Sequence, residues 1–202
     1  MKPSILAAVL ALAAAPAAAV HAQAADAGVA QIQALDASLL DTMKAAKSLG
    51  AEGRARKLTP AIQQAYDLPT MTRFAVGPKW AAMSPADQAA LIQAFTRMTA
   101  ASYAHNFDSY SGERFVVDPA VETRGPDKLV HAHILSSGKP VDLTYRMRQA
   151  TDGRWKIIDV YYRGSISELT TQRSDFASAL DKGGAPALLK KINALADKQM
   201  KG

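Results

Sequence analysis

Four consecutive segments between residues 114 and 162 have the residue pattern of β-strands. In the third segment apolar and polar residues alternate, and this period of two predicts a half-buried strand. Its apolar face consists of Val141, Leu143, Tyr145 and Met147. The four segments are RFVVD (114–118), KLVHAHIL (128–135), PVDLTYRMR (140–148) and RWKIIDVYY (154–162). Because the joins between them are short and rich in turn formers, the pattern predicts an antiparallel meander with one covered face.

The chain before these strands has the apolar spacing of helices. In residues 29–49, apolar side chains recur at intervals of three and four, which predicts a helix that stops near Gly50. We expect a polar connection at 51–57 and a second helix from about Thr59, with Pro60 at its first helical position.

The next helices are marked by proline, serine and glycine. Residues 67–80 are interrupted by prolines and a glycine and predict only short helical pieces. Ser84 and Pro85 predict a long helix that runs to about Phe107, because serine caps free backbone N–H groups and proline suits the first turn. Two further helices are expected after the strands, at 167–180 and from about 186 onward.

The order of elements is helices, then a meander, then helices, with no internal repeat and no interior linker. This order predicts a single α+β domain over residues 25–202. We expect a curved antiparallel sheet of four strands, or slightly more, with the N-terminal and C-terminal helices packed on one face.

Residues 1–24 are typical of a secretory signal peptide. Lys2 precedes an apolar run from about Ile5 to Val20, and small residues follow at Ala22-Gln23-Ala24. The alternative is a retained N-terminal anchor, against which Pro16 and the alanine-rich end of the run argue. The signal predicts export to the periplasm of a Gram-negative cell.

Composition excludes several classes of function. The sequence contains no cysteine, which removes thiol nucleophiles, iron–sulfur clusters and cysteine-based zinc sites. The formal net charge of +6 fits either a solvated surface or attraction to an anionic membrane or acidic partner. Export and the lack of any RNA-binding signature argue against nucleic acid as a partner.

Two residue sets are candidates for chemistry. His131 and His133 lie two apart on one strand face, a spacing that fits either two metal ligands or two polar residues on the wetter face. No third ligand is evident nearby, so no metal and no cofactor is expected. Asp159 lies between apolar neighbours and near Tyr145; it is either a general acid or base of a cone-shaped isomerase fold or a structural carboxylate bonded to backbone, Arg163 or Arg173. With no second catalytic partner identifiable, the structural interpretation is favoured.

Three separated stretches resemble the MlaC / toluene-tolerance family of periplasmic lipid-binding proteins of ABC-type lipid transport systems. They are DLPTMTRFAVGPKWAAMSPADQAALIQAFTRMTAASYAHNFDSYSG (67–112), VDLTYRMRQATDGRWKIIDVYYRGSISE (141–168) and TTQRSDFASAL (170–180). The phrases MTRFAVGPKW, YSGERFVV and ISELTTQRSDF are similar to the HpnM branch, which is associated with hopanoid biosynthesis.

This resemblance implies an apolar cavity for acyl chains, enclosed by the helices and the sheet, with no catalysis and no metal. The residues that we expect to line such a cavity come from the apolar faces of the predicted elements. They are Phe74, Trp80, Phe95, Met98, Leu143, Tyr145, Met147 and Ile157.

The resulting hypothesis is a periplasmic lipid carrier that shuttles a phospholipid or a hopanoid-type lipid between membranes or membrane transport complexes. Exposing one 16-carbon chain to water costs roughly 12 kcal/mol, so an aqueous carrier must enclose it. We expect the protein to bind a lipid and a membrane lipid-transport complex. We also expect it to be a monomer. The alternatives are a non-carrier accessory protein of an envelope transport complex, and an isomerase or hydrolase that uses Asp159.

Overall fold

The computed structural model describes residues 26–201, and the predicted signal peptide lies outside these described residues. Its helices are α1 (Ala27–Lys44), α2 (Ala46–Ala65), α3 (Leu68–Val76), the 3-10 helix η1 (Gly77–Ala82), α4 (Pro85–Asn106) and α5 (Glu168–Lys201). Its strands are β1 (Arg114–Arg124), β2 (Asp127–Leu135), β3 (Val141–Gln149), β4 (Trp155–Tyr162) and the short β5 (Ile166–Ser167).

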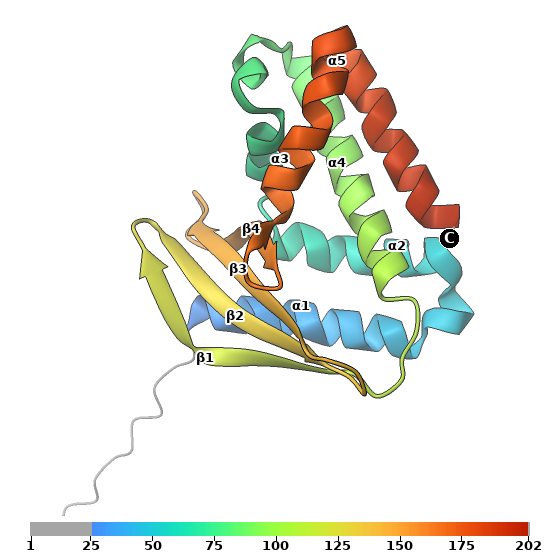
Figure 1. Ribbon diagram of the computed structural model, residues 1–202, viewed down its shortest axis with the longest axis vertical. Helices are drawn as coiled ribbons and strands as arrows, with labels where there is room; N and C mark the ends of the chain where they lie inside the picture. The colour runs from blue at the N-terminus through green and yellow to red at the C-terminus, as the bar shows by residue number, and fades with distance from the viewer. Residues whose placement is uncertain (1–25, 202) are drawn as a thin grey trace, which may run out of the picture.

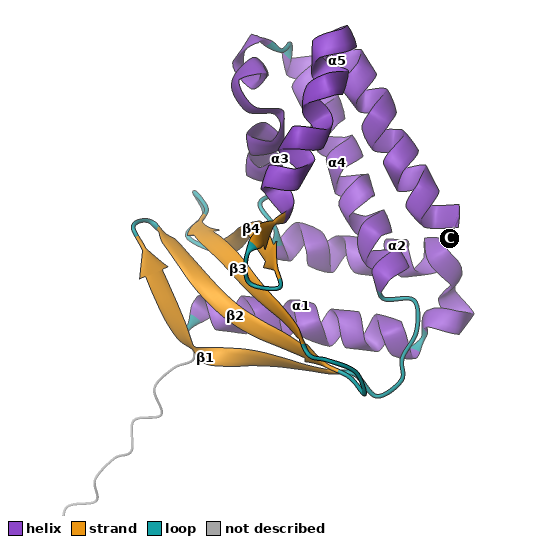
Figure 2. Ribbon diagram, viewed as in Figure 1, coloured by secondary structure: helices purple, strands orange, loops and turns teal. Residues whose placement is uncertain are grey.

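The strands form one antiparallel sheet in chain order, β1-β2-β3-β4-β5. This confirms the predicted α+β class and the meander. Figures 1 and 2 show α1 crossing the sheet, with α3, α4 and α5 standing beyond it as a helical unit. Helix α4 packs against α2 and α5, while α1 contacts β1, β2 and β4.

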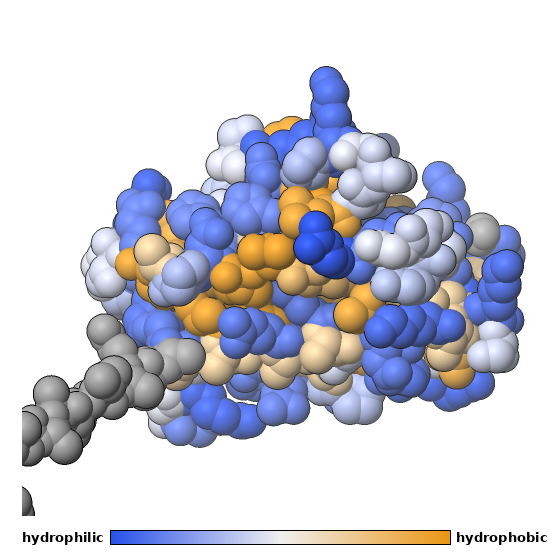
Figure 3. All heavy atoms as spheres, turned by 90° about the horizontal axis from the view of Figure 1, so that it is seen from below, coloured by the Kyte–Doolittle hydropathy of each residue, from blue (hydrophilic) through white to orange (hydrophobic). Residues whose placement is uncertain are grey.

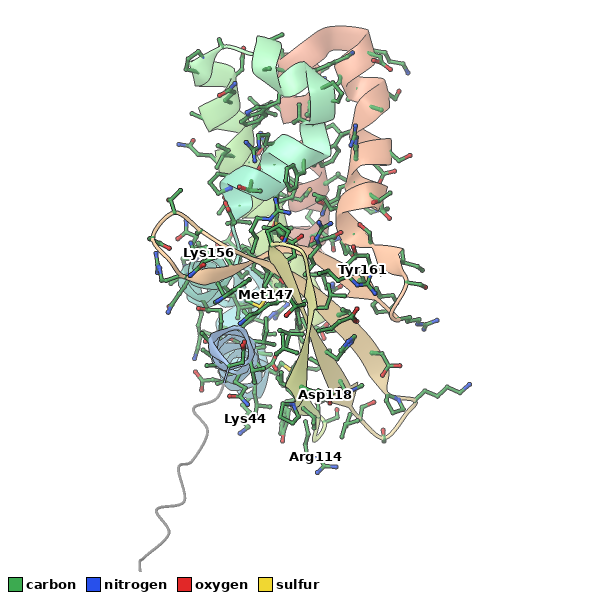
Figure 4. All side chains as sticks on the ribbon, turned by 90° about the vertical axis from the view of Figure 1, so that its left-hand side faces the viewer. Lys44, Arg114, Asp118, Met147, Lys156 and Tyr161 are labelled. Atoms are coloured by element: carbon green, nitrogen blue, oxygen red, sulfur yellow. The ribbon has the colours of Figure 1, made fainter. Side chains whose placement is uncertain are left out.

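The alternation in β3 decides which face of the sheet is covered. Pairing places Tyr145 opposite Val130 and Val160, and all three side chains therefore share the inner face with Leu143 and Met147. In Figure 4, Met147 and Tyr161 lie on opposite sides of the sheet, with α1 on the Met147 side. The inner face is the one that the helices cover, as the sequence pattern predicts.

The outer face carries paired polar side chains. Asp127 is buried there and accepts hydrogen bonds from Arg148 at 2.5 Å and Arg146 at 2.6 Å. Burial by itself would raise the pKa of Asp127, but the two guanidinium groups outweigh it and hold the pKa below its ordinary value. The two faces of the sheet therefore differ in chemistry.

The helix prediction before the sheet needs one correction. Residues 51–57 are helical and not a polar connection, and Pro60 lies inside α2 and not at its start. The helical path breaks at Gly50, which has φ +62° and ψ 179°, a conformation that glycine alone adopts readily. Glu52, Arg56 and Lys57 misled the prediction because they form the exposed side of a helix whose opposite side buries Leu58 and Ile62. Arg54 is buried and donates hydrogen bonds to the carbonyl oxygens of Ala104 and Ala46.

The later helices follow the predicted boundaries. The Ser84 side chain accepts a hydrogen bond from the Asp87 backbone N–H at 3.1 Å and caps α4. Helix α5 is interrupted at Gly183 and Gly184, where the sequence predicts the break between two helices. Within residues 26–201, no helix combines the length and the apolar character that a membrane crossing requires.

Candidate functional site

A cavity of about 190 Å³ lies between the inner face of the sheet and the C-terminal half of α4, with the start of α5 at its rim. The sheet contributes residues of β2, β3 and β4, and the helices contribute residues of α3, α4 and α5. Its lining is Tyr66, Met71, Met98, Thr99, Ser102, Tyr103, Asn106, Phe107, Ile134, Leu143, Tyr145, Val160, Tyr162, Glu168 and Gln172. This volume is below the roughly 300–1,000 Å³ of typical ligand pockets, so a long ligand requires the walls to move apart.

The floor of this cavity is buried and mostly apolar. Met71, Met98 and Tyr145 are at most 6% exposed. Their neighbours Tyr103 and Phe107 stack with ring centroids 5.6 Å apart. The two methionines suit a wall that changes shape, because the unbranched thioether side chain repacks readily.

The rim is more polar and more exposed. Tyr162 is 37% exposed and pairs with Ile166 of β5, which is 55% exposed. Glu168 begins α5 at this rim, and the pKa of its carboxyl is raised by burial and by the nearby Asp159. An amphiphile with its apolar part on the floor would therefore meet polar groups at the rim.

A buried carboxyl group lies in α1, outside the lining of the cavity. Asp36 of α1 is 6% exposed, and neither of its carboxylate oxygens has a hydrogen-bond partner among the described residues. Burial raises its pKa from 3.8 to about 7. Burial raises the pKa values of the Tyr66, Tyr103 and Tyr145 hydroxyls, and the charge of Asp36 adds to this shift.

The tyrosine hydroxyls form a cluster. Those of Tyr66 and Tyr103 hydrogen-bond to each other, and their rings meet edge to face with centroids 6.0 Å apart. Burial raises the pKa of the Tyr103 hydroxyl to about 12 and that of Tyr145 well above its ordinary value, so both remain protonated donors. The cavity therefore has hydrogen-bonding groups next to its apolar floor.

The structure brings three of the eight predicted lining residues together in this cavity: Met98, Leu143 and Tyr145. Phe95, Met147 and Ile157 are fully buried in the adjoining core, outside the cavity wall. Phe74 and Trp80 each line a different, shallower depression beside α3. Whether any of the eight contacts a lipid stays a prediction.

Sequence reasoning missed Asp36 and did not propose Tyr66, Met71 or Tyr103 as lining residues. Asp36 falls four residues after Ile32 and three before Leu39, which places it on the apolar stripe of α1. A charged residue on such a stripe is a signal of buried polar chemistry. The tyrosines gave no comparable signal, because only the packing of α2 and α4 against β3 brings them together.

Asp159 is a structural carboxylate in its contacts. Its oxygens accept hydrogen bonds from the backbone N–H groups of Val160 at 2.8 Å and Leu169 at 3.1 Å, and from the Ser167 hydroxyl at 2.7 Å. It shares the outer face with its cross-strand neighbour Arg146, whereas Tyr145 lies on the inner face. The isomerase-like site that would require Asp159 beside Tyr145 is therefore not formed. The contacts match the alternative interpretation, in which Asp159 is a structural carboxylate bonded to the backbone.

The two histidines lie on the outer face with separate partners. The His131 ring is 3.0 Å from the Thr144 hydroxyl, and His133 is 2.8 Å from Asp142. Hydrogen bonding to Asp142 raises the pKa of His133. Residues 26–201 contain no group of three or more side chains placed to hold a metal ion.

Other hollows on the surface are more open to solvent than this cavity. One of them, of about 820 Å³, lies between α2, α4 and the end of α5. Nine of its fourteen lining residues are polar or charged, including Arg56, Arg97 and Asp197. Figure 3 also shows a band of apolar surface, bordered by hydrophilic side chains, on the side seen from below.

The fold and the cavity define a class of protein in which helices and an open antiparallel sheet enclose a partly apolar hollow. The MlaC protein family model matches residues 33–194, and the chain belongs to this family. No curated protein matches the sequence.

A solved structure shares the fold. The chain is similar to a phospholipid-binding protein from Ralstonia solanacearum, determined in complex with a phospholipid, with a TM-score of 0.74 and 20% sequence identity. The match covers 85% of this chain and 98% of the other. At this identity the likeness establishes the fold.

Proposed function

We propose that this protein is a periplasmic lipid carrier that holds a phospholipid or a hopanoid-type lipid and shuttles it between membranes or membrane transport complexes. The observation that carries the proposal is the cavity between the sheet and α4, with Met71, Met98 and Leu143 on its wall. Membership of the MlaC family and the phospholipid-binding structural relative support the same function.

The cavity is too small to enclose a whole acyl chain without a change in its walls. Enclosing a long acyl chain requires α4 and the start of α5 to move away from the inner face of the sheet. The glycine break at Gly183 and Gly184 in α5 and the methionines on the wall offer flexible points for such a change. The affinity of the cavity for an apolar chain only has to match that of the bilayer. The free energies of lipid uptake and release can then be nearly balanced, and partner proteins set the direction of transport.

The direct test is to purify the protein gently from its own periplasm, extract bound lipids and identify them by mass spectrometry. The proposal predicts a lipid in about a one-to-one ratio with the protein. Recovery of no lipid from any gentle preparation would refute it. The class of the recovered lipid decides between phospholipid and hopanoid.

A non-carrier accessory role remains the second hypothesis, and the small cavity is the observation that favours it. In that case the protein would co-purify with a membrane transport complex through surfaces such as the apolar band in Figure 3, without lipid. The same preparation separates the two functions, because it reports bound lipid and bound protein independently.

A further inference from the structure

Three arginines from distant parts of the chain line one hollow on the outer side of the sheet. The hollow has a volume of about 510 Å³ and lies between the outer face of β3 and β4, the end of α3 and the start of α5. Arg73 belongs to α3, Arg146 to β3 and Arg173 to α5. Tyr161, which is labelled in Figure 4 on the outer side of the sheet, lies on the same wall. The hollow is therefore separate from the lipid cavity on the inner face.

The positive charge of this hollow is only partly compensated. Arg146 and Arg148 share a single carboxylate, that of Asp127. Within residues 26–201, no carboxylate lies within ion-pair distance of Arg73 or Arg173. Cations that share one hollow repel each other, and an anion bound between them removes this repulsion.

The other polar groups on the wall already have partners. The oxygens of Asp159 accept hydrogen bonds from the N–H groups of Val160 and Leu169 and from the Ser167 hydroxyl. The Thr170 N–H at the start of α5 donates to the same hydroxyl oxygen. The donors that remain for a ligand in this hollow are therefore the guanidinium groups.

Local contacts hold two of these guanidinium groups in place. The guanidinium of Arg173 lies against the backbone of Gly77, where an added Cβ atom would be 3.1 Å from its Nε atom. Glycine at this position therefore allows the close approach. The guanidinium of Arg73 lies over the ring of Phe74, with its Cζ atom 5.3 Å from the ring centroid. A planar guanidinium group that is already positioned loses little conformational entropy when it binds an anion.

We propose that this hollow binds a phosphoryl group through Arg73, Arg146 and Arg173. A phosphoryl group presents several oxygens in a tetrahedral arrangement and accepts hydrogen bonds from more than one guanidinium at once, whereas a carboxylate presents only two oxygens. A lipid headgroup and a soluble phosphate supply the same chemistry. The inference goes beyond the proposed carrier function, because the hollow lies outside the lipid cavity and does not require a bound acyl chain.

The first test follows the amide chemical shifts of the isotope-labelled protein by NMR during titration with sodium phosphate. Sodium chloride at equal ionic strength shows the effect of salt alone. The proposal predicts saturable, phosphate-specific shifts at Tyr161, Leu169 and Thr170, which line the hollow. It predicts no such shifts around Arg56, which lines the separate hollow between α2, α4 and the end of α5.

Substitutions then locate the binding. Arg73→Gln and Arg173→Gln should each weaken phosphate binding by at least about tenfold, as loss of a charge-assisted hydrogen bond does. Arg56→Gln removes the same charge elsewhere and is the matched control, so it should leave the affinity unchanged. All three side chains are exposed, and thermal melts check that each variant folds like the wild type.

A second probe distinguishes the two sources of the phosphoryl group. Cosedimentation compares vesicles of phosphatidylcholine alone with vesicles that also contain phosphatidic acid, whose headgroup is a phosphate. If the source is a headgroup, Arg73→Gln and Arg173→Gln weaken binding to the phosphatidic acid vesicles by at least about tenfold and Arg56→Gln does not. If the source is a soluble phosphate, the two substitutions weaken only the binding of inorganic phosphate.

Two results overturn the inference: no saturable binding of either probe, or equal weakening by all three substitutions, which indicates a general attraction between charges. The lipid content of native preparations is measured independently. Protein without lipid that still binds phosphate in this hollow refutes the carrier function and leaves the phosphoryl site intact.

Discussion

At the scale of single residues, Asp36 is the least compatible with a simple apolar core. Its neighbours Ile32, Leu35 and Leu39 on the buried side of α1 are apolar, and burial raises the pKa of Asp36 to about 7. The protein thus retains a carboxyl group that is neutral at mildly acid pH and charged at mildly alkaline pH. Because the unfolded chain has the ordinary pKa of 3.8, the folded state binds this proton more tightly.

The stability contribution of Asp36 therefore depends on pH. It is most favourable below pH 4, decreases as the pH rises from about 4 to 7, and is constant above that range. The whole change amounts to roughly 4 kcal/mol. The Asp36→Asn variant, which cannot ionise, should lack this decrease, so its free energy of unfolding relative to the wild type should rise across the same range. Urea unfolding at several pH values measures the difference, and parallel curves for the two proteins would contradict it.

At the scale of elements, the start of α5 is held to β4 by side-chain and backbone hydrogen bonds. Asp159 accepts from the Leu169 N–H and from the Ser167 hydroxyl, which in turn accepts from the Thr170 N–H at 3.0 Å. Since Glu168 and Gln172 of the same helix line the cavity, these bonds set the position of one cavity wall. The contacts of Asp159 thus hold the start of α5 against β4, next to the cavity.

Replacing Asp159 by alanine should loosen this connection. Three donors lose their acceptor, and we expect a loss of about 1.5–3 kcal/mol in the free energy of unfolding. Chemical denaturation measures the loss, and hydrogen exchange should show faster exchange at Leu169 and Thr170. A variant as stable as the wild type would show that the capping contacts contribute little.

The break inside α2 depends on one glycine. Gly50 has φ +62° and ψ 179°, and a Cβ atom there meets no other atom within 4 Å, so the cost of a side chain is conformational and not steric crowding. Gly50→Ala should therefore cost about 1–3 kcal/mol in the free energy of unfolding. Gly138→Ala, at a glycine without positive φ, is the control and should have a smaller effect. Equal effects of the two substitutions would argue against a special role for Gly50.

At the scale of the whole molecule, the helices and sheet act as two walls around the cavity. The volume of about 190 Å³ is small for an acyl chain, so the proposed lipid uptake requires the walls to separate. The core behind the floor, with Phe95, Met147 and Ile157 fully buried, supplies a rigid base for that movement. Ligand binding and wall separation are therefore expected to be coupled.

A substitution that fills the cavity with a larger side chain tests whether the lipid binds there. Leu143 is half-buried and lines the cavity, so Leu143→Trp should displace the ligand and reduce recovered lipid at least tenfold, as a steric block of the site does. Val116→Trp introduces the same side chain on the exposed outer face and should bind lipid normally. Lipid extraction from both variants gives the comparison. Equal lipid content in the two would place the lipid elsewhere.

The sequence by itself determined the elements. Period-two alternation in 141–148, the Ser84-Pro85 helix start and the glycine pair at 183–184 are local signals, because they depend on backbone geometry and solvent exposure within a few residues. The same locality produced the error at 51–57, where polar residues on the exposed side of a helix resemble a loop. The family resemblance, carried by separated motifs, supplied the expectation of a cavity that no local pattern contains.

Only the tertiary structure decided which residues meet at that cavity. Apolar side chains such as Phe95 and Met98 are alike in sequence pattern, yet one is core and the other is wall. The difference depends on how α4 lies over the sheet, and therefore on contacts between residues far apart in the chain. Asp36 and Tyr145 likewise come from distant segments, α1 and β3. Both are buried because α1 and the sheet pack together, and burial is a property of the assembled core.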